Sequence, residues 1–252
     1  MIKIKKLINI THFKKDVISG IFMAFINMLL LILAYPIYLK IVGPELYGLW
    51  TSLSIFVFIA SMGQIGIHKA IIKFIAQEKG VNNYYNINKY FSSGIFILMA
   101  GNILIIFIIM YGGSYYINII DLSKNYSLLA KQAIPYFCLL LPLIFLVQYL
   151  KGVLTGLGNV QTANYLFAAG DVSKVIITII FLYNKNGLFS FIYGWIVSNV
   201  ILLVIYIYIL IYQKKLKLLL NFNIIKKETI SLLSFGKYIL LNSILNTTFI
   251  PL

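Results

Sequence analysis

VISGIFMAFINMLLLILAYPIYL, the stretch from Val17 to Leu39, contains no Asp, Glu, Lys or Arg. Four more charge-free apolar stretches follow it, at 46–68, 90–120, 132–150 and 186–213. Each is long enough to cross the hydrocarbon layer of a bilayer, which takes about 20 helical residues. Unpaired backbone amides are not tolerated in lipid, and the stretches lack the alternation of a barrel strand. The sequence therefore predicts an all-α bundle that crosses the lipid bilayer repeatedly.

The composition excludes a soluble domain. Of the 252 residues, 61% are hydrophobic and only 11% are charged, and the mean hydropathy is +0.95. A soluble domain has too little interior to cover so much apolar surface. The single cysteine, Cys138, lies within an apolar stretch, so an intrachain disulfide is excluded and we interpret the residue as a small core side chain.

We expect six spanning helices and the start of a seventh. The predicted ranges of the six are 17–39, 47–67, 91–112, 132–150, 162–183 and 189–212. The seventh begins near Ser231 and continues to Pro251 and Leu252. The expected organisation is an amino-terminal segment (1–16), a six-helix lobe (17–212), a basic linker (213–230) and the start of a second lobe (231–252).

The seventh segment bears on whether the chain is whole. Natural chain ends seldom fall inside a spanning helix, and no polar tail closes this one. We therefore expect the chain to be a fragment whose second lobe is missing. The alternative is a natural half-length protein of which two copies pair.

Lysine placement predicts the orientation of the helices. All 21 basic residues are Lys, and positive residues in short loops stay on the side from which the chain is inserted. Fifteen lysines fall on the side of the amino terminus, against four on the other: Lys40, Lys124, Lys131 and Lys185. We expect a cytoplasmic amino terminus. The net charge of +15 follows from this topology and does not indicate a nucleic-acid partner.

Groups for enzymatic or metal chemistry are sparse. The six acidic residues are scattered at Asp16, Glu45, Glu78, Asp121, Asp171 and Glu228. Only Asp171 falls inside a predicted span. His12 and His68 lie far apart, and neither has a cluster of cysteines or carboxylates at metal-ligand spacing. We therefore predict no enzyme activity, no cofactor and no metal site.

Polar residues recur at helical spacing within three of the apolar segments. The first stripe is Trp50, Ser54, Ser61, Gln64 and His68. The second, if the fourth helix continues past Lys151, is Gln148, Lys151, Thr155 and Asn159. The third is Asn164, Asp171, Lys174 and Thr178. Such residues either line a common polar interior or form hydrogen bonds between packed helices.

Asp171 and Lys174 stand apart from the other polar residues, because a charge inside the membrane is a functional hypothesis by default. Their spacing of three residues allows them to neutralise one another on one helix face. They either line a water-filled path or form a purely structural pair.

Several short motifs occur together in the first two thirds of the chain. They are YPIYL (35–39), GPELYGL (43–49), GQIGI (63–67), AIIKFIA (70–76) and KGVLTGLG (151–158), followed by Asn164. In this combination the sequence resembles the amino-terminal lobe of bacterial O-antigen and polysaccharide flippases. These proteins belong to the multidrug, oligosaccharidyl-lipid and polysaccharide exporter superfamily.

The resemblance implies a two-lobed transporter in the bacterial cytoplasmic membrane. Its substrate would be a polyprenyl-diphosphate-linked oligosaccharide, such as an O-antigen, capsule or exopolysaccharide repeat unit, moved outward by alternating access. An anionic diphosphate with a hydrated sugar cannot cross hydrocarbon unaided. The resemblance also implies glycan-assembly membrane proteins as partners.

The candidate substrate-path residues divide by role. They are Lys151 and Lys174 for the substrate's negative charge, Gln148, Asn164 and Gln64 for hydrogen bonds to the sugar, and Asp171 for coupling to an ion or proton. The chain departs from the family where many relatives carry an acidic residue, at Gln64, and where Arg is common, at Lys73 and Lys151. An Arg guanidinium presents a planar fork of N–H donors, whereas the ammonium group of these lysines is a point charge.

Two alternative functions stay open. A multidrug or small-cation exporter of the same superfamily would favour acidic groups in this lobe, which offers only Asp171. A non-transporting scaffold for glycan assembly would leave Asp171 and Lys174 as packing residues.

Overall fold

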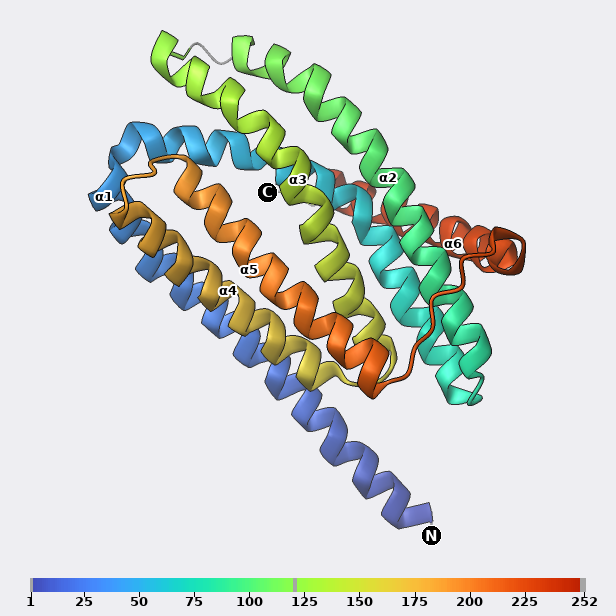
Figure 1. Ribbon diagram of the computed structural model, residues 1–252. Helices are drawn as coiled ribbons and strands as arrows, with labels where there is room; N and C mark the ends of the chain where they lie inside the picture. The colour runs from blue at the N-terminus through green and yellow to red at the C-terminus, as the bar shows by residue number, and fades with distance from the viewer. Residues whose placement is uncertain (1, 120–121, 250–252) are drawn as a thin grey trace.

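The computed structural model describes residues 2–119 and 122–249, with the side chains of 13–58, 60–61, 64, 66–119 and 122–242. Every regular element in the described ranges is a helix (Figure 1). The helices are α1 (Ile2–Gly80), α2 (Tyr84–Ile119), α3 (Lys124–Gly156), α4 (Val160–Tyr183), α5 (Phe189–Ile207), the π-helix η1 (Tyr208–Gln213) and α6 (Phe222–Phe249).

Five helical stretches in the described residues are long and apolar enough to cross a membrane. They are Phe13–Phe58 in α1, all of α2, α3 and α4, and Phe189–Gln213 across α5 and η1. The predicted all-α, multi-pass membrane bundle is therefore confirmed.

α1 is bent back on itself at Gly43. This residue has φ 78° and ψ 166°, outside the helical region and costly for any residue with a Cβ. The arm before Gly43 lies beside α4, and the arm after it passes behind α3 (Figure 1). The helices expected at 17–39 and 47–67 correspond to these two arms.

The other helices extend beyond the predicted spans. α2 contains 91–112, α3 contains 132–150, α4 begins two residues before 162, and α5 with η1 covers 189–213. All the predicted spans except 162–183 lie within stretches bounded by charged residues, whereas a helix continues past its first charged residue as long as backbone hydrogen bonds continue. For this reason α3 runs past Lys151 to Gly156, which keeps Gln148, Lys151 and Thr155 on one helix but leaves Asn159, the last residue of the predicted stripe, at the start of α4.

α6 begins at Phe222, nine residues before the expected segment start at Ser231. It packs on α1 and α2, and two hydrogen bonds fix the approach. The Leu219 amide donates to Ser92 Oγ at 2.7 Å, and Ser93 Oγ donates to the Ile225 carbonyl at 3.2 Å. Half of the linker expected at 213–230 is therefore helical. The membrane segment from Ser231 stays a prediction, and its end at Pro251 and Leu252 lies outside the described residues.

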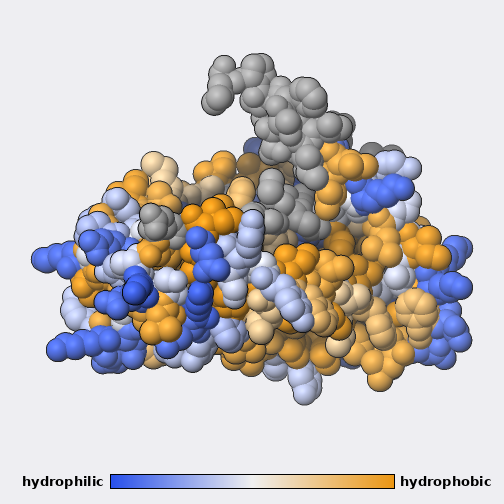
Figure 2. Space-filling model, turned by 90° about the horizontal axis from the view of Figure 1, so that it is seen from above, coloured by the Kyte–Doolittle hydropathy of each residue, from blue (hydrophilic) through white to orange (hydrophobic). Residues whose placement is uncertain are grey.

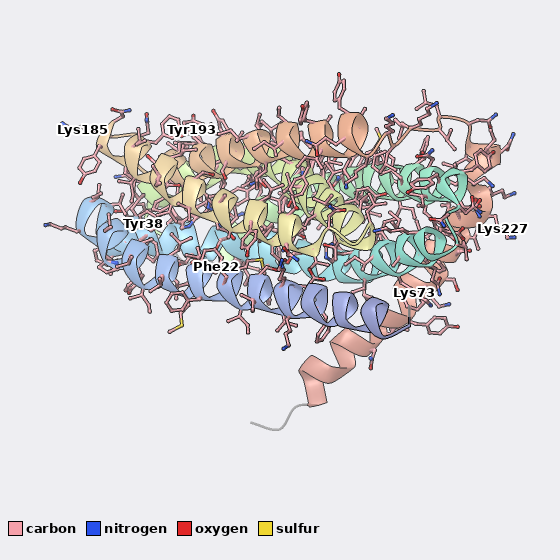
Figure 3. All side chains as sticks on the ribbon, turned by 90° about the horizontal axis from the view of Figure 1, so that it is seen from below. Phe22, Tyr38, Lys73, Lys185, Tyr193 and Lys227 are labelled. Carbon is pink, nitrogen blue, oxygen red and sulfur yellow. The ribbon has the colours of Figure 1, made fainter. Side chains whose placement is uncertain are left out.

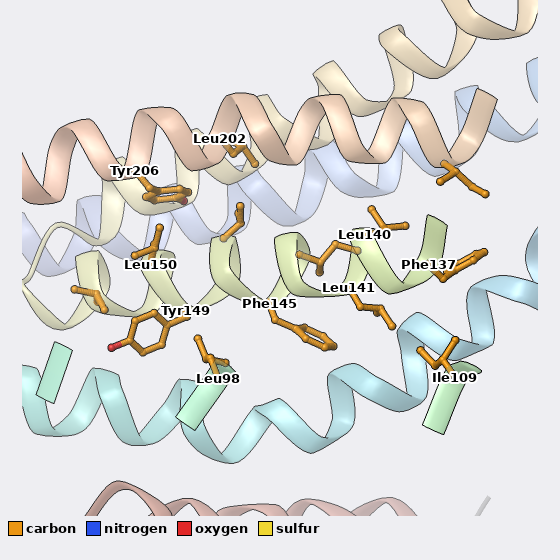
Figure 4. Packing of buried hydrophobic residues seen from close by; sticks show 14 of the residues in the cluster. Leu98, Ile109, Phe137, Leu140, Leu141, Phe145, Tyr149, Leu150, Leu202 and Tyr206 are labelled. Atoms are coloured by element: carbon orange, nitrogen blue, oxygen red, sulfur yellow. The ribbon is translucent and has the colours of Figure 1, made fainter. Parts of the chain in front are cut away.

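α3 is the most buried of the five candidate spans and forms the centre of the core. Phe137, Leu140 and Phe145 are fully enclosed between α3 and its neighbours (Figure 4). Tyr149 is also buried and donates a 2.6 Å hydrogen bond from its hydroxyl to the Phe91 carbonyl of α2, which satisfies the one polar atom of the ring.

Hydrophilic and hydrophobic surface residues are separated along the length of the bundle. In Figure 2 the hydrophilic residues gather toward the two ends and hydrophobic residues lie between them. Figure 3 places Lys185 at one end and Lys73 and Lys227 at the opposite end. The lysines that the sequence assigns to different sides of the membrane are thus separated in space. Which end faces the cytoplasm stays a prediction, and the side chains of Lys3, Lys5 and Lys6 lie outside the described residues.

Candidate functional site

A cavity of about 290 Å³ lies between the second arm of α1, α3 and α4. We call it the lysine cavity; its lining consists of Ser61, Gln64, His68, Lys69, Gln148, Lys151 and Phe167. Three of the candidate residues, Gln64, Gln148 and Lys151, meet here. The polar stripe of α1 therefore faces the polar stripe of α3, as a common polar interior requires.

Lys151 places a half-buried positive charge in this cavity. Its Nζ lies 3.8 Å from the centroid of the Phe167 ring and 3.4 Å from Met23 Sδ. Among the side chains that the structure describes, ion pairs join Lys89 to Glu228 and Lys174 to Asp171, and none includes Lys151. An aromatic face stabilises a cation only in part, so the Lys151 ammonium can still accept an anionic partner.

His68 is a member of the lysine cavity that was not among the candidate residues. Its Nδ1 lies 3.0 Å from the Gln148 carbonyl oxygen. A carbonyl only accepts, so Nδ1 carries the hydrogen. This hydrogen bond fixes the second arm of α1 to α3.

Asp171 and Lys174 form the ion pair that their spacing allows. Lys174 Nζ lies 2.6 Å from Asp171 Oδ1, and the two side chains are 28% and 17% exposed. The Lys174 ammonium also lies 5.0 Å from the centroid of the Trp195 ring. Lys174 is thus a neutralised charge, whereas Lys151 is not.

A larger cavity of about 710 Å³ opens between the first arm of α1, α4 and α5. We call it the aromatic cavity, because six rings line it: Tyr35, Tyr38, Tyr47, Trp50, Phe191 and Trp195. Asp171 and Lys174 line it too, together with Asn27. The sequence placed only Trp50 of these rings on a polar stripe, although Tyr35, Tyr38 and Tyr47 belong to the YPIYL and GPELYGL motifs.

A third cavity, of about 170 Å³, adjoins both of the others. It shares Gln148 and Phe167 with the lysine cavity. It shares Asp171, Lys174 and Trp195 with the aromatic cavity. Five of the six candidate residues therefore line one chain of adjoining cavities inside the helix bundle.

Asn164 is the candidate residue that lines none of these three cavities. It is buried, and its Nδ2 donates to Ser19 Oγ at 3.0 Å. Ser19 Oγ in turn donates to the Asp16 carbonyl at 2.7 Å, and Gln161 Nε2 donates to Asp16 Oδ1 at 3.2 Å. Asn164 therefore ties α4 to the first arm of α1, which is the helix-to-helix contact that polar stripes also form.

The chain belongs to the polysaccharide biosynthesis protein family, whose description matches it over residues 13–250. The recognition of an amino-terminal flippase lobe from the sequence motifs is thereby confirmed at the level of the family. No curated protein matches the chain.

Solved transporter structures share the fold. A MOP-superfamily transporter from Pyrococcus furiosus, described as having a binding pocket of reverse polarity, aligns with a TM-score of 0.74 at 16% identity over 91% of this chain and 52% of its own. A mutant MATE protein aligns with a TM-score of 0.77 at 16% identity, over 92% of this chain and 53% of its own. An outward-facing multidrug-resistance MATE transporter aligns with a TM-score of 0.73 at 16% identity, over 91% of this chain and 52% of its own. The chain thus spans about half the length of these structures, as one lobe does.

Proposed function

We propose that the chain forms one lobe of a flippase that moves a polyprenyl-diphosphate-linked oligosaccharide across the bacterial cytoplasmic membrane by alternating access. The observation that carries this proposal is the lysine cavity, where an ammonium that forms no ion pair among the described side chains shares a lining with the amides of Gln64 and Gln148. O-antigen, capsule and exopolysaccharide repeat units all have the required chemistry, namely an anionic head on a long apolar tail.

In this proposal each arm of α1 crosses the membrane once. Both arms exceed the roughly 20 residues that a crossing takes. With α2, α3, α4 and α5 they make six crossings, and the amino terminus lies on the cytoplasmic side with Lys73 and Lys227. A second transporter lobe would be one partner, since the matched transporters are about twice as long as this chain. Glycan-assembly membrane proteins would be the others.

The diphosphate would bind at Lys151. Phosphate oxygens accept charge-assisted hydrogen bonds from an ammonium group, and these bonds are about twice as strong as neutral ones. The side-chain amides of Gln64 and Gln148 would donate to the remaining oxygens or to the first sugar. Lys174 would contribute less charge, because Asp171 already neutralises it. A coupling role for Asp171 would require this pair to open when the carboxylate takes up a proton or ion.

A small-cation exporter is the second candidate, and the aromatic cavity with its Asp171 carboxylate is the observation that favours it. The ion pair with Lys174 weighs against it, since no net negative charge is left to attract a cation. A non-transporting scaffold would need no ligand in any of the three cavities.

Changing Lys151 tests the proposal in the full gene product, in cells whose surface glycan depends on it. We expect Lys151→Ala to reduce surface glycan about 10-fold or more at an unchanged membrane level, because a charged hydrogen bond of about 1.5–3 kcal/mol is lost. Lys151→Arg keeps the charge and should retain part of the export. Lys185→Ala, at the far end of the bundle and exposed, is the matched control. Normal export by Lys151→Ala would refute the proposal.

A further inference from the structure

The aromatic cavity is built around a rigid wall of two rings. Trp50 and Phe191 stack with centroids 5.1 Å apart and planes 13° apart, and both are buried. Trp195 meets Trp50 edge-on at 5.2 Å and 84°. These contacts join the second arm of α1 to α5 and fix the orientation of Trp195, the more open of the two tryptophans.

Three tyrosines continue this surface toward the open side of the cavity. Tyr35 and Tyr47 lie 5.4 Å apart in a T-shaped pair, and Tyr38 meets Phe191 edge-on at 5.0 Å. Tyr35 is 51% exposed, so part of its ring is free to contact a ligand. These three residues come from the two sides of the Gly43 bend, which brings their rings together.

Polar groups lie along one side of the same cavity. Asp171 and Lys174 offer a carboxylate and an ammonium whose charges cancel. Asn27 adds an amide whose Oδ1 is buried and has no hydrogen-bond partner among the described residues. A buried acceptor without a partner is costly, so a ligand donor that reached it after a shift of the amide would be stabilising.

We propose that the aromatic cavity is the subsite for the sugar rings of the transported glycan, separate from the lysine cavity that binds the diphosphate. A pyranose has a face of C–H groups, which pack on the negative face of an aromatic ring, and a rim of hydroxyls. The hydroxyls would bond to Asn27, Asp171 and Lys174. The assignment deepens the proposed flippase function and rests on it for the identity of the ligand.

The size of the cavity admits a sugar, and its charge supports a neutral sugar over an organic cation. The volume of about 710 Å³ lies within the range of roughly 300–1,000 Å³ for small-molecule sites. An organic cation would meet no net negative charge, and the Lys174 ammonium already lies over the Trp195 ring. The third cavity joins the two subsites, so one substrate could occupy both.

Tryptophan fluorescence tests the assignment directly, because the chain has only two tryptophans, Trp50 and Trp195, and both line this cavity. We would titrate the purified full chain in detergent with maltotriose and with chitotriose. The expected result is a saturable change in emission, with a dissociation constant on the order of 1 mM, for at least one trisaccharide. Inorganic pyrophosphate, which suits the lysine cavity, should leave the emission unchanged.

Two variants locate the response. Tyr35→Leu removes an exposed ring of the cavity and should weaken trisaccharide binding about 2- to 10-fold. Tyr183→Leu, 72% exposed and outside the cavity lining, is the matched control and should bind normally. Trp195→Phe keeps a ring in place and should retain binding while removing the response of the more open tryptophan.

The contrary outcomes are distinct from those of the export experiment. No saturable response to either trisaccharide overturns the sugar subsite, even if Lys151→Ala abolishes export. A response to tetraethylammonium alone also overturns it and indicates a cation site. Trisaccharide binding combined with normal export by Lys151→Ala leaves the subsite standing and refutes the proposed diphosphate site.

Discussion

Lys151 and Lys174 both place a positive charge among apolar helices, yet their surroundings differ. Lys151 lies over Phe167 and forms no ion pair with a described carboxylate, while Lys174 is held by Asp171 at 2.6 Å. A buried charge is costly unless it is paired. Removing Asp171 would therefore turn Lys174 into a second unpaired charge, whereas removing Lys174 would do the same to Asp171.

We predict that the combined change is less harmful than the sum of the two single changes. Asp171→Asn and Lys174→Gln should each lower the free energy of unfolding, and the double variant should lose less than the sum, with a coupling of about 0.5–3 kcal/mol. Thermal unfolding of the purified variants in detergent measures this. Strict additivity would mean that the pair contributes nothing to stability.

Changes at the same two residues also bear on transport. If both Asp171→Asn and Lys174→Ala exported surface glycan normally, the pair would be structural. Neither residue would then belong to the substrate path. We expect a larger loss of export for Lys151→Ala than for Lys174→Ala, because the Lys174 charge is already neutralised.

At the scale of the helices, close packing depends on glycines in α3. Gly152 and Gly156 are spaced as in a small-xxx-small motif, which lets two helix backbones approach closely. A Cβ built on Gly156 would lie 2.9 Å from Ile75 Cβ and 3.0 Å from the Ile72 carbonyl oxygen, both on α1. The space between α1 and α3 is therefore too small for a side chain.

We predict that Gly156→Ala destabilises the protein by about 1–3 kcal/mol, because overpacking forces the two helices apart. Gly112→Ala in α2 is the matched control, since a Cβ there meets nothing within 4 Å. Thermal unfolding in detergent distinguishes them: the midpoint should fall for Gly156→Ala and stay level or rise for Gly112→Ala. Equal midpoints would contradict the close packing of α1 on α3.

At the scale of the whole molecule, the two ends of the bundle carry different lysines. Lys185 lies at one end, and Lys73 and Lys227 lie at the other (Figure 3). Lysine excess on the inner side is the rule for short membrane loops. The end with Lys73 and Lys227 is therefore proposed to face the cytoplasm.

Cysteine labelling tests this orientation, because Cys138 is the only native cysteine. In a Cys138→Ser background, Lys185→Cys should react with a membrane-impermeant thiol reagent in intact cells. Lys227→Cys should react only after the membrane is permeabilised. The reverse pattern would invert the topology and would place the lysine cavity nearer the outer side.

Much of the fold could be read from the sequence, and one part of the site could too. Charge-free runs placed the helices, and spacing along α1 and α3 put Gln64, Gln148 and Lys151 on polar faces that do meet. The same spacing put Asn164 on a stripe with Asp171, although Asn164 instead bonds to Ser19. Helical periodicity gives the face of a helix but not the neighbour that this face contacts.

The sequence by itself determined that the chain is helical and membrane-spanning, because lipid leaves no other way to satisfy the backbone of the long apolar runs. It also determined which lysines lie at opposite ends of the bundle. The family could be recognised from the sequence as well. Only the tertiary structure decided that Lys151 has no ion-pair partner among the described side chains, that His68 lines the same cavity, and that the rings around the Gly43 bend enclose a cavity with Trp195. Those features depend on contacts between residues far apart in the chain, which local sequence patterns do not specify.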